Sequence, residues 1–212
     1  MDGLCVYLGT DLGRFDESNK NKSVEKPNGE LWISYAGTLG HSYNIEIIFD
    51  AMNQLSDDLA QKVVFHVFGD GPYLERFQEY SENCKIPSVF HGRMDYSTMV
   101  AYLCKSDIAV NPIVKGAAQS IINKHADYAA AGLPVVNTQE CKEYRDLLET
   151  YECGINCEVE SVEQVAKALQ ELIENPEKRK QMGENSRRMA EERFDRRNTY
   201  QQIVKVIEEL AR

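Results

Sequence analysis

A polar cluster within residues 116–136 carries the side-chain types that bind phosphate and sugar. The cluster consists of Gln119, Ser120, Asn123, Lys124 and Asp127. Gly132 and Pro134 follow and predict the end of a helix, since glycine fits the position after a helix and proline cannot continue one. The cluster is therefore expected at a helix N-terminus, where free N–H groups and the helix dipole attract anions. Lys124 adds a mobile positive charge and Asp127 can accept hydrogen bonds from hydroxyls, although a capped surface helix explains the same residues.

Strand and helix patterns alternate along the rest of the chain. Strands are predicted at 31–36, 63–68, 89–91, 108–112 and 135–137, with extended chain at 154–159. Helices are predicted at 45–55, 73–83, 97–105 with Ser97 as N-cap, 142–150, 162–174, 178–193 and 198–212. Residues 16–30 are polar and are interpreted as a linker. This alternation predicts an α/β fold, a Rossmann-like parallel sheet with helices on both faces.

Glycine-rich turns follow three of the predicted strands, at Gly37, Gly69–Gly71 and Gly92. In parallel sheets, ligands bind at the carboxyl ends of the strands, so these turns are expected to gather beside the polar cluster and form a cleft. Neither the G-x-G-x-x-G fingerprint nor the P-loop motif occurs, which argues against a dinucleotide site of that type and against a P-loop NTPase.

The net charge and the cysteine content of the chain limit the kinds of partner and compartment that fit it. The 212 residues carry a formal net charge of −10 and a sequence pI near 5.0, which argues against nucleic acid and anionic membranes as partners. No apolar run approaches the length of a membrane span. The six cysteines form no CxxC pair and no zinc spacing, so we expect free thiols in the cytoplasm.

The segment 116–136 resembles the donor site of the family-4 (group 1) glycosyltransferases, which are retaining, nucleotide-sugar-dependent enzymes of GT-B fold. Gln119 and Asp127 lie eight residues apart, at the positions of that family's paired glutamates, and the sequence from Asp127 onward follows its E-A-x-A-x-G-x-P-V motif. Ser120 and Asn123-Lys124 look like the S-x-N-K variant of capsule-type members. Further segments resemble the family in order: 35–40, 68–72, 89–93 and 106–112.

The two ends of the chain resemble the family's interdomain connections. Residues 6–15 are similar to the crossover between its domains, and residues 192–195 to the E-x-F motif before its final return helix. The resemblance implies a crossover segment and linker at 1–30, a donor-binding domain at 31–193 and a C-terminal return helix at 194–212. The N-terminal acceptor domain is absent, so this chain by itself is expected to be inactive.

The resemblance also assigns residues to roles. It implies that the donor nucleotide is bound by Gly37, Thr38, Gly40, Gly69, Gly71, Arg93, Ser120, Asn123, Lys124 and Asp127. Gln119 would take the catalytic position beside the sugar, with the Asn111 amide as a possible helper, and Asp127 would bind the ribose. Thr38 and Tyr43 stand at positions where many members carry positively charged residues that bind the diphosphate. Binding of the diphosphate would therefore depend more on Lys124. No metal ion and no cofactor other than the nucleotide-sugar substrate is implied.

The function expected from the resemblance is hexosyl transfer from a nucleotide sugar, with UDP suggested by the Asn123-Lys124 type. The acceptor would be a saccharide or lipid-linked saccharide in capsular or other surface polysaccharide biosynthesis. Expected partners are this donor, the absent N-terminal domain and the acceptor; nucleic acid is not among them, and membrane contact would come only through the absent domain. Two alternatives stay open, a non-catalytic nucleotide- or sugar-binding module and a nucleotide-sugar epimerase of GT-B fold, which would need acid/base carboxylates and histidines in both halves.

Overall fold

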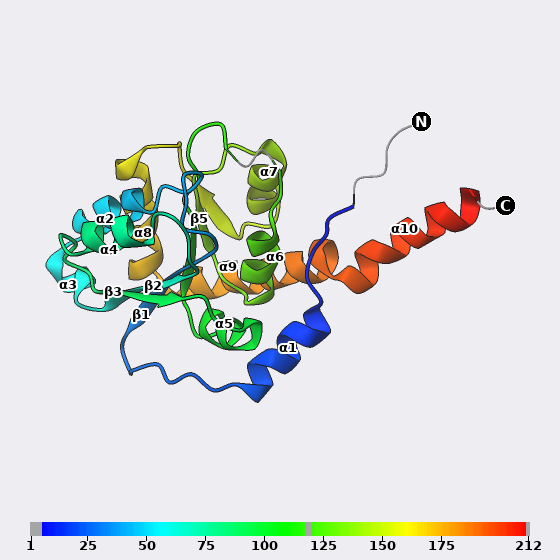
Figure 1. Cartoon of the computed structure of the whole chain (residues 1–212), viewed down its shortest axis with the longest axis horizontal. Helices are drawn as coiled ribbons and strands as arrows, with labels where there is room; N and C mark the ends of the chain where they lie inside the picture. The colour runs from blue at the N-terminus through cyan, green and yellow to red at the C-terminus, as the bar shows by residue number, and fades with distance from the viewer. Residues whose placement is uncertain (1–5, 118–119, 211–212) are drawn as a thin grey trace.

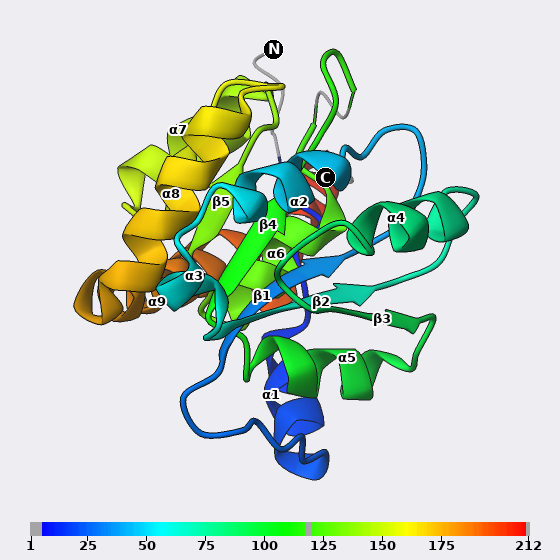
Figure 2. The same ribbon diagram turned by 90° about the vertical axis from the view of Figure 1, so that its left-hand side faces the viewer.

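The computed structural model describes residues 6–117 and 120–210. Within this part of the chain, six parallel strands form one sheet in the order β3-β2-β1-β4-β5-β6 (Figure 2). The strands are β1 (Leu31–Ala36), β2 (Val63–Phe68), β3 (Ser88–Gly92), β4 (Ile108–Asn111), β5 (Val135–Asn137) and β6 (Gly154–Asn156). All six residues of β1 are buried, as expected for a central parallel strand covered on both faces. The predicted Rossmann-like fold is confirmed.

Two hydrophobic cores lie on the two faces of this sheet. One is built with α2 (Glu46–Asn53), α3 (Asp57–Ala60), α4 (Leu74–Ser81) and α8 (Val162–Glu174). The other is built with α1 (Leu12–Asn21), α5 (Tyr96–Leu103), α6 (Asn123–Ala130) and α7 (Lys142–Thr150). Helix α9 (Pro176–Met189) contributes Met182 to the first core and Met189 to the second. Burial of these apolar faces is the main stabilising force of the fold.

Helix α1 corrects the predicted linker, because residues 16–21 are helical. The Asp11 carboxylate accepts the Arg14 N–H at 3.0 Å and so caps the helix. Leu12 and Phe15, three residues apart, are buried in the second of the two hydrophobic cores and hold the helix in place. The extended connection is therefore confined to residues 22–30. A second correction concerns α5, whose N-cap is Asp95 rather than Ser97.

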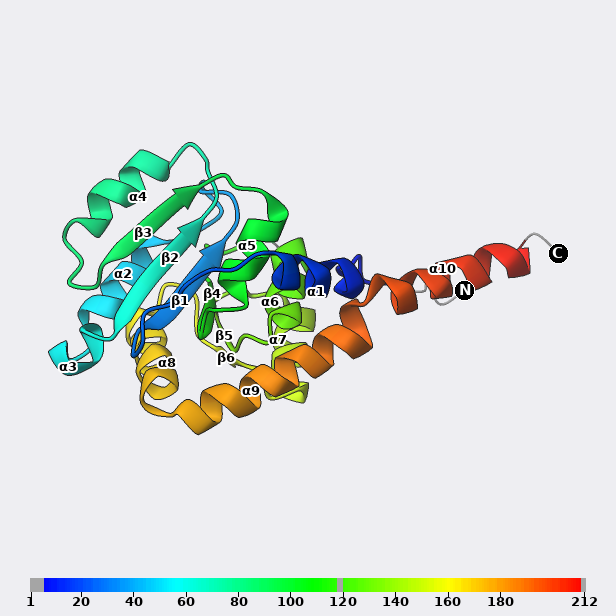
Figure 3. The same ribbon diagram turned by 90° about the horizontal axis from the view of Figure 1, so that it is seen from below.

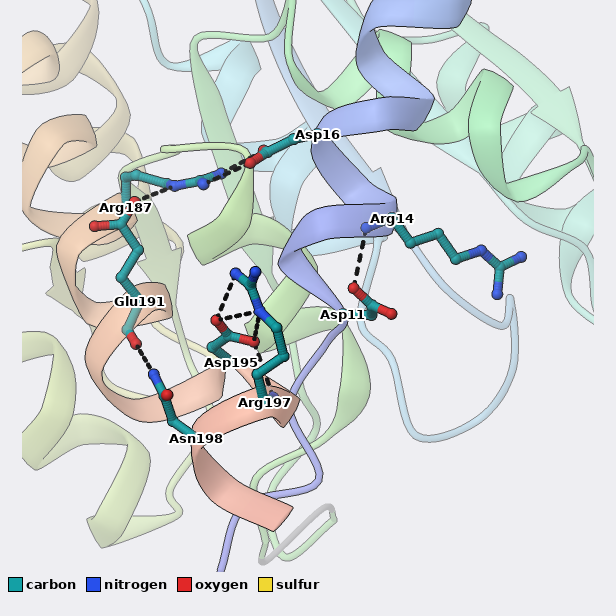
Figure 4. A network of polar contacts seen from close by, with 8 residues as sticks. All are labelled: Asp11, Arg14, Asp16, Arg187, Glu191, Asp195, Arg197 and Asn198. Atoms are coloured by element: carbon teal, nitrogen blue, oxygen red, sulfur yellow. Dashed lines mark hydrogen bonds and ion pairs between the residues drawn. The ribbon is translucent and has the colours of Figure 1, made fainter. Parts of the chain in front are cut away.

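The crossover segment and the C-terminal helices are joined. The Thr10 N–H donates to the Phe194 carbonyl at 2.8 Å, and the Arg196 N–H donates to the Thr10 carbonyl at 3.1 Å. Figure 4 shows the side-chain part of this junction, in which the Arg187 guanidinium on α9 makes a two-pronged ion pair with Asp16 on α1, at 2.8 and 2.9 Å. These contacts place α1 against α9 although the two are far apart in the sequence.

The last helix, α10 (Arg196–Leu210), follows the π-helical turn η1 (Ala190–Phe194) and extends away from the rest of the molecule (Figures 1 and 3). Its exposed apolar residues are Tyr200, Ile203, Val204, Val206 and Ile207. Among the described residues, no helix has the length and apolar character that a bilayer crossing requires.

Candidate functional site

The glycine turns after β1, β2 and β3 pack directly on one another at the carboxyl edge of the sheet. A Cβ atom on Gly69 would lie 1.8 Å from the Gly37 carbonyl oxygen, and one on Gly71 would lie 2.2 Å from the Leu39 carbonyl oxygen. The Gly37 N–H donates to the Phe68 carbonyl and the Gly69 N–H to the Gly92 carbonyl, each at 2.9 Å. These glycines therefore permit close approach of three turns, a role that no side chain can share.

These hydrogen bonds limit the number of free amides that the loop after β1 can offer to a phosphate. The N–H groups of Gly37 and Leu39 already have carbonyl partners, Phe68 and Asp70. The N–H groups of Asn123 and Lys124 at the start of α6 are in a different situation, because a helix leaves its first N–H groups without intrahelical partners, whereas the next one, that of His125, donates to the Ile122 carbonyl at 3.1 Å. Donors for an anion are consequently expected from α6 more than from the two bonded amides of the loop.

A cleft opens along this edge of the sheet. Its first part has a volume of about 620 Å³ and is lined by Gly37, Thr38, Phe68–Gly71, Gly92–Met94 and Met99. Its second part, of about 360 Å³, shares Gly37, Thr38 and Met99 with the first and adds residues of α6 and Tyr43. We call the two parts together the edge cleft. It runs from the ends of β2 and β3 to the N-terminus of α6.

The edge cleft brings together most of the residues that the sequence singles out. Its lining includes Gly37, Thr38, Gly69, Gly71, Arg93, Asn123, Lys124 and Asp127. Gly40 is buried within its turn and does not line the cleft. Ser120 is exposed, and its carbonyl oxygen accepts a hydrogen bond from the Gln139 amide at 2.8 Å. Gln119, the residue expected at the catalytic position, lies outside the described residues.

Helix α6 begins at Asn123, which is later than the expected start near Ser120. The His125 Nδ1 atom accepts the Ile122 N–H at 3.3 Å, and the buried imidazole stacks on Tyr144 with ring centroids 3.5 Å apart. The Tyr128 hydroxyl accepts the Ala36 N–H at 2.8 Å and so fastens α6 to the end of β1. The helix ends at Ala130, and Gly132 has a φ of 67°, which confirms the predicted stop.

Lys124 is buried, which corrects the expectation of a mobile surface cation. Its side-chain nitrogen lies 4.0 Å from the ring centroids of both Tyr35 and Tyr43. It has no hydrogen-bond partner among the described residues. Burial lowers the pKa of Lys124 well below its usual value. Tyr43 thus stands where the resemblance places a loop cation, and supplies an aromatic face to a cation from α6.

Asp127 is held by groups that the sequence did not reveal. The Tyr96 hydroxyl donates to Asp127 Oδ1 at 2.9 Å, and the Thr10 hydroxyl lies 3.1 Å from the Tyr96 hydroxyl. Burial raises the pKa of the Asp127 carboxyl, and the hydrogen bonds from Tyr96 and Thr10 act in the opposite direction. A second, separate cavity of about 280 Å³ lies beside this group and is lined by Gly9–Asp11, Arg14, Tyr96, Asn123, Asp127 and Arg196.

Asn111 is fully buried, and its amide group is engaged behind α6. The Asn111 Nδ2 group donates to Asn137 Oδ1 at 2.8 Å and lies 3.2 Å from the His125 Nε2 atom. The amide therefore joins β4, β5 and α6, and it supports the elements that carry the site. In the described part of the chain, no group of three or more His, Cys, Asp or Glu side chains comes together in a way that could hold a metal ion.

A parallel α/β sheet with a cleft at its carboxyl edge defines a class of domains that bind nucleotide-like ligands at that edge. Within this class, the chain belongs to the glycosyl transferases group 1 family, whose family model matches residues 16–189. The sheet and its helices correspond to the C-terminal half of the GT-B fold.

Individual relatives agree with this assignment. The chain is 26% identical to an uncharacterised glycosyltransferase of Methanocaldococcus jannaschii over 208 residues, which is 97% of this chain and 52% of the relative. Among solved structures, it is similar to Anabaena HepE in complex with UDP-glucose, with a TM-score of 0.76 at 16% identity, covering 96% of this chain and 57% of that one. Sucrose-phosphate synthase from Thermosynechococcus elongatus gives a TM-score of 0.74 at 18% identity, covering 97% and 52%. The chain thus spans about half the length of these relatives.

Proposed function

We propose that this chain is the donor-binding domain of a retaining glycosyltransferase that uses a UDP-linked sugar. The observation that carries the proposal is Lys124, whose amine lies against two aromatic rings and has no hydrogen-bond partner among the described residues. A buried, unpaired cation is costly unless an anion joins it. The diphosphate of a nucleotide sugar is such an anion, and the first N–H groups of α6 lie in the same part of the edge cleft.

The remaining lining fits the other parts of a nucleotide sugar. The backbone of Gly92–Met94 borders the open end of the cleft, where we place the nucleobase. Asp127 lines the part of the cleft beside Met99 and α6, where we place the hydroxyls of the ribose that joins the base to the diphosphate. As the bond from the sugar to the diphosphate breaks, negative charge grows on the departing phosphate, and Lys124 would stabilise that charge. Gln119 would orient the sugar hydroxyls without contributing a negative charge.

Nucleotide titration of the purified chain tests this proposal. UDP is expected to raise the melting temperature and to bind in calorimetry more tightly than GDP, because the Asn123-Lys124 pattern favours UDP. Asp127→Ala should weaken UDP binding by roughly tenfold or more, since hydrogen bonds to a charged group contribute about 1.5–3 kcal/mol. A chain that is stabilised by no nucleoside diphosphate would refute the assignment of the cleft.

The whole enzyme is proposed to include an N-terminal acceptor domain, because the relatives are about twice as long as this chain. The exposed apolar face of α10 would pack on that domain, as a helix that crosses back to it. Val204 and Ile207, which are 52% and 60% exposed, are central to this face. The acceptor would be a saccharide or lipid-linked saccharide, in cytoplasmic assembly of a surface polysaccharide.

A non-catalytic nucleotide-binding module is the second candidate, and the Gln119 amide at the position of a glutamate is the observation that favours it. The two functions differ in one product. Together with an N-terminal domain, a transferase releases UDP from a UDP-sugar, whereas a binding module leaves the donor intact. A coupled assay for released UDP separates them.

A further inference from the structure

Tyr96 links the edge cleft to the crossover segment through its hydroxyl group. On one side the hydroxyl donates to Asp127 Oδ1 at 2.9 Å, and on the other it lies 3.1 Å from the Thr10 hydroxyl. The three residues come from α5, α6 and the crossover segment, so the contact exists only in the folded chain. Asp127 is partly exposed and lines both the edge cleft and the neighbouring cavity, so its carboxylate remains accessible to a ligand.

An aspartate at this position needs outside support. Its carboxylate is carried on one methylene, so the surrounding groups decide where its oxygens point. Burial disfavours the charged form of the carboxyl, and donated hydrogen bonds favour it. A donor fixed on Oδ1 leaves the remaining lone pairs of the carboxylate available for a pair of ligand hydroxyls.

On the basis of the proposed function, we propose that Tyr96 is the positioning residue that holds the Asp127 carboxylate for the ribose diol of a ribonucleoside diphosphate. Thr10 holds the Tyr96 hydroxyl from the crossover side. Recognition of the diol thus depends on the segment that leads toward the other half of the enzyme. The selectivity of the site for a ribonucleotide is the property that Tyr96 controls.

The experiment compares UDP with dideoxy-UDP, which lacks both ribose hydroxyls, by calorimetry on the full chain. The wild type is expected to bind UDP roughly tenfold or more tightly than dideoxy-UDP. Tyr96→Phe removes only the hydroxyl, and it should reduce this ratio by about threefold to tenfold while leaving dideoxy-UDP binding unchanged. If Tyr96 had a purely structural role, the Tyr96→Phe substitution would weaken the binding of both ligands equally and the ratio of their affinities would stay constant.

Two further variants sharpen the result. Thr10→Val retains the shape of its side chain and should lower the ratio in the same direction, because it removes a hydroxyl that contacts Tyr96 and that also favours the charged form of Asp127. Tyr102→Phe is the matched control, because Tyr102 lies on the same helix but packs against Phe68 and His91, with ring centroids 5.2 and 4.6 Å apart. This control should leave the ratio unchanged.

The outcomes separate this inference from the proposed function. If the wild type prefers UDP and Tyr96→Phe keeps the full preference, the role of Tyr96 is refuted and the donor site stands. Equal binding of UDP and dideoxy-UDP by the wild type would refute the proposed hydrogen bonds from the ribose hydroxyls to Asp127, and with them the role of Tyr96. If the wild type binds neither ligand, the proposed function fails first and this inference falls with it.

Discussion

At the scale of single residues, the edge cleft is marked by a lysine that is only 8% exposed. Lysine is almost never buried without a partner, since removing an ammonium from water is costly. The aromatic faces of Tyr35 and Tyr43 recover part of this cost. The position of Lys124 is therefore expected to reduce the stability of the domain, and under the proposed function this cost is offset when the diphosphate binds.

Lys124→Met should separate stability from binding. Methionine fills nearly the same space without a charge, so the free energy of unfolding of the ligand-free chain is expected to rise by about 1–2 kcal/mol. Affinity for UDP should fall by roughly tenfold or more, because the charge-assisted contact is lost. Urea denaturation and calorimetry measure the two effects. Lys167→Met, at a site whose side chain is 73% exposed, should change neither; a loss of stability in the Lys124 variant would contradict this account.

At the scale of elements, the three glycine turns act as one unit at the end of β1–β3. The turn after β2 comes so close to the turn after β1 that backbone atoms occupy the place of a side chain at Gly69 and Gly71, and a backbone hydrogen bond joins it to the turn after β3. At these glycines the wall of the edge cleft is backbone, and no side chain fills the space beside it. The same turns connect β2 and β3 to their helices. A substitution that displaces one turn is therefore expected to disturb the packing of its neighbours along this edge of the sheet.

Gly69→Ala tests this packing. Its Cβ would lie 1.8 Å from the Gly37 carbonyl oxygen at a φ of +136°, so the backbone must shift and the free energy of unfolding should fall by about 3 kcal/mol or more. At Gly92 a Cβ meets nothing within 4 Å, and φ is +66°. Gly92→Ala should therefore cost only about 1–2 kcal/mol. Chemical denaturation of both variants distinguishes them, and equal costs would show that contact between the turns is unimportant.

A pair of histidines on β2 and β3 is expected to make the free energy of unfolding depend on pH. His66 Nδ1 lies 2.8 Å from His91 Nε2, and the His66 ring packs on Trp32 with centroids 4.3 Å apart. Burial, with smaller contributions from His91 and Lys26, lowers the pKa of His66 to about 4. The folded state therefore holds this imidazole neutral at pH values where the unfolded chain protonates it.

Stability should accordingly fall as the pH drops below the usual histidine value near 6.5 toward 4, because the unfolded state then binds the extra proton. The expected slope from His66 is about 1 kcal/mol per pH unit in this window, and it vanishes above about pH 7. His66→Phe, which cannot titrate, should flatten the slope of the unfolding free energy between pH 7 and 5. His41→Gln is the control at an exposed loop position. An unchanged slope in the Phe variant would assign the pH dependence to other groups.

At the scale of the whole molecule, the segment around Thr10 and helix α1 pack against the C-terminal helices and are part of the domain's structure. Thr10 pairs with the backbone beside Asp195, and Asp16 on α1 binds Arg187 on α9 (Figure 4). Arg187 also donates to the Ala130 carbonyl at the end of α6, at 3.0 Å. Helix α1 is thereby tied to the helix that carries Lys124 and Asp127.

Asp16→Asn should loosen this connection. The Arg187 guanidinium lowers the pKa of the Asp16 carboxyl, so the pair stabilises the fold at neutral pH and the contribution fades as acid protonates Asp16. Because the pair is partly exposed, the expected loss is about 1 kcal/mol. Hydrogen exchange should show faster opening of residues 12–21. Glu163→Gln, which breaks the exposed pair with Lys167, should have almost no effect; equal effects would make the α1–α9 pair an ordinary surface contact.

The sequence by itself determined the alternation of strands and helices, the parallel sheet and the positions of the glycine turns. These features are local, because apolar periodicity and turn residues act over a few neighbouring positions. It missed helix α1, whose residues 16–21 fall within the polar stretch interpreted as a linker, because the apolar residues Leu12 and Phe15 that bury this helix precede that stretch. The tertiary structure alone decided the environment of the site. Tyr35 and Tyr43 enclose Lys124, and Tyr96 and Thr10 hold Asp127, across separations in the chain that no local pattern spans. Such contacts depend on the order of strands in the sheet, which brings distant residues to one edge, and that order is a property of the whole fold.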